Sequence, residues 1–440
     1  MLAGRWRIPM LALCIPPLLL AIASLPWRRE APPTPPQVTV LALGSGPLLA
    51  GAGESAFDVP EGAPIAGFSR RPWGWSSLPP ARPVEARAVV LATAGCRVAL
   101  VSAEILVVPP ELARAVAGRL SDLALDGVLV GATHTHAGPG GYWDDALAQA
   151  VGIGPFRADM ARRIEEGIER SVRSAAAQLG PARAGMATLD ASTLVHNRDA
   201  GARDGRLTVV RVERPGGEPV AEVVVLGAHA TLLGKGNRSI DGDWPGRLMA
   251  ERPHGLRLFL QGTIGDQSAE MPSPREPSRY ARSVSALAAR AEVLFPTVAG
   301  GGKPGVGTAL AYARAEVPLP AFTPGAVPGW LRPAARTLLG GSVPASASVS
   351  ALRVGPALLV AVPAEPVAAV TAAWRARAGL GGATFVTLAD GYVGYAETAE
   401  RFERREGEAV RAYLGPALAD RLGEGAETAA AAIGGGAGAR

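Results

Sequence analysis

Short runs of valine, leucine and alanine recur along this 440-residue chain, and loops rich in glycine and proline separate them. Apolar runs of this length between turn residues predict β-strands. Other segments carry apolar side chains at helical spacing, most regularly residues 157–179. Because strands and helices alternate without a strict βαβ rhythm, we expect an α/β fold in which a mixed β-sheet core is flanked by helices. Long Gly/Pro-rich loops at the strand ends are then expected to form the active site.

The individual elements can be placed along the sequence. The predicted strands are 86–108 (a hairpin), 126–132, 206–214, 218–231, 255–261, 348–366 and 383–398. Helices are predicted at 109–123, 157–179 and 277–295, and 296–345 is expected to be loop-rich.

Composition excludes several classes of protein. Hydrophobic residues make up 48% of the chain and charged residues 19%, which is typical of a globular protein and not of a disordered one. The net charge is +5, but the arginines are dispersed and no basic run alternates with aromatics, so a nucleic-acid partner is not expected. The two cysteines, Cys14 and Cys96, provide no disulfide framework, and Cys96 is expected to be buried near a strand.

The N-terminal segment has the pattern of an export signal. Arg5 and Arg7 precede an uncharged apolar stretch, so we expect residues 1–27 to be a signal peptide or a membrane anchor. This predicts an exported protein, periplasmic or extracellular, or one anchored by a transmembrane segment. The remaining chain is expected to comprise a proline-rich linker (28–47), a catalytic domain (48–415) and a disordered Ala/Gly-rich tail (416–440).

Two of the five histidines lie one residue apart in GATHTHAGPGG, directly after a predicted strand. On an extended segment, His134 and His136 point to the same side and can enter one cavity. Such a pair can supply two zinc ligands, or one ligand and one acid–base group. A pair of hydrogen-bonded surface histidines is the alternative.

Three further side chains follow apolar runs. His229 comes after VVVLGA, and Glu365 ends VAVPAEP, where a free carboxylate is costly without a cation. Two histidines and a carboxylate form a zinc-ligand set, although a core histidine and a loop glutamate are the alternatives. Ser268 follows a glycine loop in GTIGDQSAE and could be a nucleophile, an oxyanion donor or an ordinary loop serine.

Several of these motifs together resemble the neutral/alkaline non-lysosomal ceramidase family, in its N-terminal catalytic domain. HTHAGPGG is close to that family's H-T-H-S-G-P-G-G, and PAEP is close to its P-G-E-P. Further similarity lies in GAGESAFDVPEGAPIAGFSRR, HNRDA, AHATLLGKGNRSIDGDWPG, GDQSAE and DGYVGYAET, so that the resemblance extends from about Gly51 to about Glu408.

The resemblance implies specific roles for individual residues. His134, His229, Glu365 and Tyr395 would be the zinc ligands, with Zn²⁺ as the cofactor. His136 would contact the reacting group, Ser268 would lie beside the scissile amide, and Arg198 would contact the substrate. The resemblance further implies a zinc-dependent amidohydrolase that acts on a lipid substrate of the N-acylsphingosine type at a membrane surface.

The chain also departs from the family pattern. No tyrosine occurs in ERREGEAV, where the family has its second active-site tyrosine, and Ala269 and Glu270 replace Pro-Asn after Ser268. We also expect the family's C-terminal immunoglobulin-like domain to be absent. These departures keep two alternatives open: a zinc hydrolase for a different lipid amide or ester, and a non-catalytic binding homologue. Four tryptophans are expected either to line an apolar slot beside the zinc or to pack within loops: Trp73, Trp75, Trp143 and Trp244.

Overall fold

The computed structural model describes residues 34–68, 71, 77–80, 82–251, 255–271, 277–293, 310–339 and 343–434. The expected leader at 1–27, Trp73 and Trp75 lie outside these residues. Among the residues described, no helix combines the length and the apolar character needed to cross a membrane.

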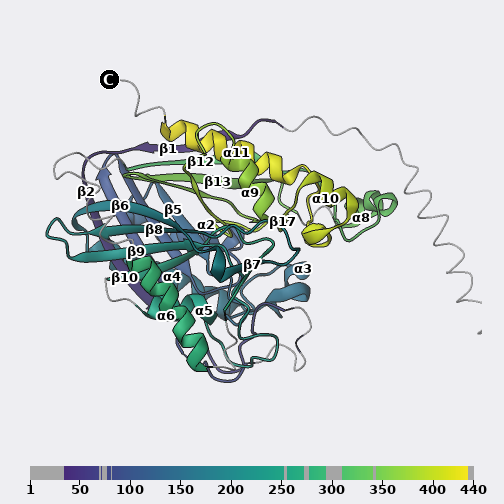
Figure 1. Ribbon diagram of the computed structural model, residues 1–440, viewed down its shortest axis with the longest axis horizontal. Coiled ribbons are helices and arrows are strands. Elements are labelled where there is room, and N and C mark those ends of the chain that lie inside the picture. The colour runs from purple at the N-terminus through teal and green to yellow at the C-terminus, as the bar shows by residue number, and fades with distance from the viewer. Residues whose placement is uncertain are drawn as a thin grey trace, which may run out of the picture.

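Two stacked β-sheets form the centre of the molecule (Figure 1), as expected for a mixed α/β fold. The larger sheet has eight strands in the order β10-β9-β8-β6-β2-β3-β4-β5 and combines parallel and antiparallel pairs. This sheet is curved, since Gln261 at the end of β10 donates a hydrogen bond to the Thr133 carbonyl just beyond β5, at 2.8 Å. The bounds are β2 Ser45–Ala56, β3 Glu85–Ala94, β4 Cys96–Ala103, β5 Gly127–Ala132, β6 Gly180–Asp190, β8 Arg206–Glu213, β9 Pro219–Leu226 and β10 Leu256–Gln261.

The smaller sheet has five strands in the order β1-β12-β13-β14-β16 and packs against the first. Two of its strands correct the expectations. Residues 37–43, expected in a linker, form the edge strand β1, and residues 310–318, expected in a loop-rich region, form β12. Leu310 and Tyr312 of β12 are fully buried between the sheets. The bounds are β1 Gln37–Leu43, β12 Leu310–Pro318, β13 Ser346–Val354, β14 Ala357–Ala361 and β16 Thr384–Val386.

Strand side chains are apolar on both faces, because each sheet packs against the other sheet on one face and against helices on its other face. In β3, Ala88 and Val90 face the helices, whereas Val89 and Leu91 face the second sheet. This alternation follows from the two-residue period of a strand, and it explains the continuous apolar runs in the sequence. The predicted hairpin is confirmed, with Gly95 at a φ of 85° between β3 and β4.

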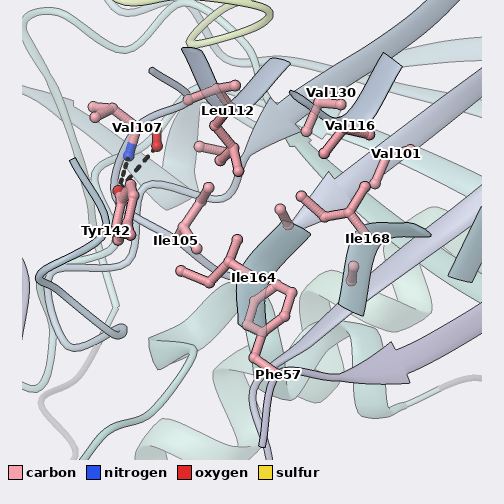
Figure 2. Packing of buried hydrophobic residues seen from close by; sticks show 14 of the residues in the cluster. Phe57, Val101, Ile105, Val107, Leu112, Val116, Val130, Tyr142, Ile164 and Ile168 are labelled. Carbon is pink, nitrogen blue, oxygen red and sulfur yellow. Dashed lines mark hydrogen bonds between the residues drawn. The ribbon is translucent and has the colours of Figure 1, made fainter. Parts of the chain in front are cut away.

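Helices cover the outer face of the larger sheet. Helix α4 buries Met160, Ile164, Ile168 and Val172, which recur every four residues, against β2 and β3. Figure 2 shows Ile164 next to Phe57, with Ile168 and the α2 side chains Leu112 and Val116 in the same cluster. The helices are α2 Pro110–Arg119, α3 Ala146–Ala148, α4 Ala158–Ala177, α5 Asp243–Ala250 and α6 Pro277–Val293.

The other outer surface carries a helix that the sequence did not predict. Residues 418–434 form α11, which packs along β12 and β13 (Figure 1), so the expectation of a disordered tail is wrong for this segment. Leu418, Leu422 and Ala426 are fully buried there. The remaining helices are α8 Arg332–Leu339, α9 Ala368–Arg375, α10 Ala399–Arg404 and α11 Leu418–Gly434; short 3₁₀ segments include Gly407–Arg411.

Candidate metal centre

The side chains of His134 and His229 meet in the interior although their strands lie apart in the sheet. His134 follows β5 and His229 follows β9, and the curvature of the sheet brings these strand ends together. Their ring centroids are 4.8 Å apart, and both side chains are almost completely buried. The expected convergence of these two histidines is present.

Glu365 and Tyr395 approach the same point from paired strands. Glu365 opens β15 (Glu365–Pro366) and Tyr395 opens β17 (Tyr395–Ala396), and the two residues are directly opposite each other in this parallel pair. Glu365 Oε2 lies 3.5 Å from His134 Nε2 and 3.3 Å from His229 Nε2. The Tyr395 hydroxyl lies 3.2 Å from His229 Nε2. All four expected ligands therefore point into one small volume.

The hydrogen bonds of the two histidines determine which nitrogen faces the centre. His134 Nδ1 is 2.8 Å from the carbonyl of Leu106, and His229 Nδ1 is 2.9 Å from the carbonyl of Gln267. A carbonyl only accepts, so each Nδ1 carries a proton and each neutral ring directs the lone pair of Nε2 inward. Burial lowers the pKa of His229 to about 4 and also lowers that of His134, so both rings are neutral at pH 7.

The centre is therefore rich in lone pairs and poor in protons. Glu365 Oε2 is buried and accepts no hydrogen bond, although two Nε2 lone pairs face it. Burial opposes ionisation of Glu365, but His134 and the other polar neighbours outweigh it, so its pKa is lowered on balance. A cation resolves the repulsion among these atoms, and two neutral imidazoles with a carboxylate form a donor set that suits zinc. The residues present fit a divalent metal ion.

His136 is close to this centre, but its backbone is arranged differently from the prediction. The H-x-H segment was expected to be extended, but His134 has a φ of 61°, which is the left-handed region. The two rings nevertheless lie edge to face, with their Nε2 atoms 3.2 Å apart. His134, His136 and His229 form a group whose potential ligand atoms lie within 4.8 Å of one another. His136 is thus placed either to coordinate or to act beside the ion.

The loop that carries His136 is held by Gly67, Phe68 and Arg71. Gly67 has a φ of 77°, and a Cβ there would lie 2.6 Å from the Cα of His136, so only glycine fits. The ring of Phe68 packs against the His136 ring at 4.9 Å. The Arg71 guanidinium donates to the carbonyls of His136 and Ala66 and thereby fixes the loop.

Ser268 lies on the neighbouring β7–β11 ribbon (Val195–Asn197 and Gln267–Ala269), and Arg198 directly follows β7. Ser268 forms a β-bridge with His229, which places its backbone beside the centre. Arg198 donates to the carbonyl of Gly265 and to Glu408 at 2.5 Å. Its side chain remains 28% exposed, so part of it is available to a substrate.

Several supporting residues could not be identified from the sequence. The Tyr392 hydroxyl donates to Glu365 Oε1 at 2.7 Å and holds the carboxylate in place. Glu408 accepts hydrogen bonds from both Arg198 and Arg411, and the Arg411 guanidinium lies 6.0 Å from the centre of the Tyr395 ring. Of the tryptophans, Trp244 is fully buried and its indole donates to the carbonyl of His229, so it packs in the core and lines no slot. Trp143 packs edge to face against Tyr392.

Comparison with known proteins supports the resemblance. Residues 82–251 match the family model described as neutral/alkaline non-lysosomal ceramidase, N-terminal. The chain is 29% identical over 214 residues to a neutral ceramidase of Mycobacterium tuberculosis, covering 41% of this chain and 33% of that protein. It is 29% identical over 133 residues to neutral ceramidase A of Dictyostelium discoideum, covering 27% and 18% respectively. The matches thus span about a third or less of these curated relatives.

The fold has a solved counterpart. The crystal structure of neutral ceramidase from Pseudomonas aeruginosa superimposes with a TM-score of 0.73, covering 88% of this chain and 75% of that chain at 19% identity. A ceramidase complexed with C2 superimposes with a TM-score of 0.71 at 18% identity, with the same coverage. This chain therefore shares its fold with both ceramidase structures over the part that is covered.

Proposed function

We propose that this chain, whose residues 82–251 match the neutral/alkaline non-lysosomal ceramidase family model, is a zinc-dependent amidohydrolase of ceramide. The reaction adds water across the N-acyl amide and releases a fatty acid and a sphingoid base. The observation that carries the proposal is the buried, unpartnered Oε2 of Glu365 facing the Nε2 atoms of His134 and His229.

In this proposal His134, His229, Glu365 and Tyr395 hold the metal ion. When bound, zinc supplies a Lewis acid that polarises the amide carbonyl and lowers the pKa of water toward about 7. The carbonyls of Leu106 and Gln267 keep the imidazoles in the ligating tautomer, and Tyr392 orients the Glu365 carboxylate.

His136 is the proposed proton carrier. Burial lowers its pKa well below the ordinary value, so the ring is neutral and can accept a proton. In the proposed step His136 takes a proton from the attacking water as the water oxygen bonds to the acyl carbon, and it passes this proton to the amine nitrogen as the C–N bond breaks. Ser268, beside His229, and Arg198, anchored by Glu408, are the proposed contacts to the developing oxyanion and the polar part of the substrate.

The test combines metal analysis with an activity assay. Purified protein is expected to contain about one zinc per chain and to release fatty acid from a fluorescent ceramide, and a chelator is expected to abolish that release. His134→Ala should lose both zinc and activity, whereas His196→Ala should keep its zinc because His196 lies outside the centre and pairs with Glu270. Full zinc content and full activity in His134→Ala would defeat the proposal.

A second candidate is hydrolysis of a different lipid amide or ester by the same centre. The observation that favours it is the pair Glu408 and Arg411 next to Tyr395, which introduces charge where the family carries a tyrosine. Parallel assays of ceramides with several acyl-chain lengths and of N-acyl amino acids separate the two candidates. Preference for the N-acyl amino acids would select the second.

We also propose that the protein is exported and acts at a membrane surface. The support is the apolar segment at 8–27 behind Arg5 and Arg7. Cell fractionation with N-terminal sequencing of the mature protein tests this proposal, and recovery of the intact chain in the cytosol contradicts it.

A further inference from the structure

The ring of His136 is held differently from the other two imidazoles at the candidate metal centre. His134 and His229 each direct Nδ1 to a backbone carbonyl. Nδ1 of His136 is buried and has no hydrogen-bond partner among the residues that the structure describes, and its Nε2 lies 3.2 Å from that of His134. The direction of the His136 ring therefore depends on what fixes its backbone and on what packs against it.

The backbone of His136 is fixed on both sides. Its N–H donates to the carbonyl of Ala230 at 3.0 Å, which ties it to the residue that follows His229. Its carbonyl accepts a hydrogen bond from Nη2 of Arg71. The only ring contact outside the histidine group, within the described part of the chain, is with Phe68, at 4.9 Å between centroids. Arg71 is thus one of three contacts that locate this imidazole.

Arg71 also connects His136 to two other segments. Its Nη2 donates to the carbonyl of Ala66 at 3.0 Å. Its Nη1 donates to the carbonyl of Asn237 at 3.0 Å and reaches that of Lys235 at 3.5 Å. A planar guanidinium presents its N–H groups in a rigid fork and can bridge several carbonyls at once, which the single ammonium group of a lysine cannot do.

Burial makes this arrangement costly unless the bridging itself is needed. Arg71 is only 6% exposed, and no carboxylate forms an ion pair with it in the described part of the chain. Burial lowers the pKa of Arg71 to about 10, so the group remains charged at neutral pH. A buried cation without an opposite charge is unfavourable, and here only backbone carbonyls compensate it. The side chain therefore acts as a fixed junction between loops and not as a partner in an ion pair.

We propose that Arg71 is a positioning residue for the hydrolysis, whose guanidinium holds the His136 backbone so that the imidazole stays beside the reacting bond. It acts through His136 and contacts neither the ion nor the substrate. The inference rests on the proposed role of His136 as the proton carrier. Displacement of an acid–base group by about 1 Å is enough to slow a reaction about 10²-fold.

Steady-state kinetics with a fluorescent ceramide test the proposal. Arg71→Ala is expected to lower kcat about 10²-fold, to change KM by less than about threefold and to retain about one zinc per chain. Arg214→Ala is the matched control and should keep its kcat, since the Arg214 guanidinium also binds only carbonyls, those of Ala50, Pro181 and Gln178. Unchanged kcat in Arg71→Ala, loss of its zinc, or an equal loss of kcat in Arg214→Ala overturns the proposal.

A double-mutant cycle shows whether Arg71 acts through His136. In the His136→Asn background, Arg71→Ala should lower kcat by less than about a further twofold, because residues that act as a unit are not additive. A further loss as large as in wild type overturns the positioning role alone. Full activity in His136→Asn defeats the proposed proton carrier, whereas an inactive His136→Asn beside a fully active Arg71→Ala defeats only this inference.

Two further measurements keep the test decisive if Arg71→Ala is unstable. Arg71→Lys retains the charge and most of the volume, yet kcat should fall at least about tenfold because one ammonium group cannot bridge the three segments. Full kcat in this variant overturns the proposal. Where Arg71→Ala does fold, millimolar guanidinium should raise its kcat at least about tenfold, and tetramethylammonium, which has no N–H donor, should not. Equal effects of the two cations contradict a role for the donor fork.

Discussion

Oε2 of Glu365 lies 3.3 Å from Nε2 of His229, and each atom presents a lone pair to the other. No hydrogen bond connects them, because the proton of the imidazole is committed to the Gln267 carbonyl. Such a contact inside a protein is stable only when a proton or a metal ion lies between the two atoms.

Glu365→Gln removes the charge of this side chain and keeps its size. We expect zinc affinity to fall about a hundredfold or more, because a buried anionic ligand is replaced by a neutral amide. Metal titration of the apoprotein with a zinc indicator measures the change. Glu400→Gln provides the control, since this glutamate is 70% exposed; equal affinity in both variants contradicts ligation by Glu365.

His136→Asn distinguishes two coordination sets. If His134, His229, Glu365 and Tyr395 hold the ion, this variant retains about one zinc per chain and loses hydrolysis by about 10²-fold or more, as expected for a lost acid–base group. If the three histidines hold it, zinc is lost along with activity. Metal content and turnover are to be measured on the same preparation, with His134→Asn as the zinc-free reference.

Asp243 predicts a dependence of stability on pH. Burial raises the pKa of this carboxyl group to about 6, although the backbone N–H groups of Leu233 and Trp244 donate to it. The folded protein therefore binds the proton more tightly than the unfolded chain, and the contribution of Asp243 is most favourable below the unfolded pKa and is lost as the pH rises through 6.

Comparison of wild type with Asp243→Asn isolates this effect. Between pH 4.5 and 7.5 the unfolding free energy of wild type, relative to the variant, should fall by about 2 kcal/mol. Urea unfolding at several pH values provides the measurement. A difference that is constant with pH shows that Asp243 does not titrate in this range.

Leu422→Ala tests whether α11 belongs to the core. This side chain is fully buried against the five-stranded sheet, so its truncation should lower the unfolding free energy by about 2–5 kcal/mol. Thr428→Ala, on a half-buried position of the same helix, should change it by about 0.5 kcal/mol or less. Thermal and urea unfolding measure both, and equal small effects would indicate that the helix frays from the sheet.

The sequence predicted most of the larger sheet and helix α4, but it did not predict strand β12 or helix α11. Apolar runs and the four-residue spacing in α4 identified the covered strands and this helix, because burial imposes those periods. Strand β12 and helix α11 were not predicted since they bury mainly alanine, valine and glycine, whose small side chains resemble loop or low-complexity sequence. Their burial depends on tertiary contacts that no local pattern reports.

Some residues of the candidate site could also be predicted from the sequence, and others could not. His134, His229 and Glu365 could be selected because each follows an apolar run, whereas Tyr395 came only from the family resemblance. The hydrogen bond from Tyr392 to Glu365 could not be predicted, because the same short loop offers two tyrosines and spacing does not determine which one contacts the carboxylate. The left-handed backbone of His134 could likewise not be predicted, since only a small minority of non-glycine residues adopt it.

Tyr392 connects the candidate metal centre to the packing around it, because its hydroxyl donates to Glu365 and its ring meets Trp143 edge to face. A change that displaces this ring also turns the carboxylate away from the two imidazoles, so a substitution at Trp143 is felt at the centre although Trp143 contacts none of the candidate ligands through a hydrogen bond. One phenol thereby makes the geometry of the centre depend on a neighbouring indole.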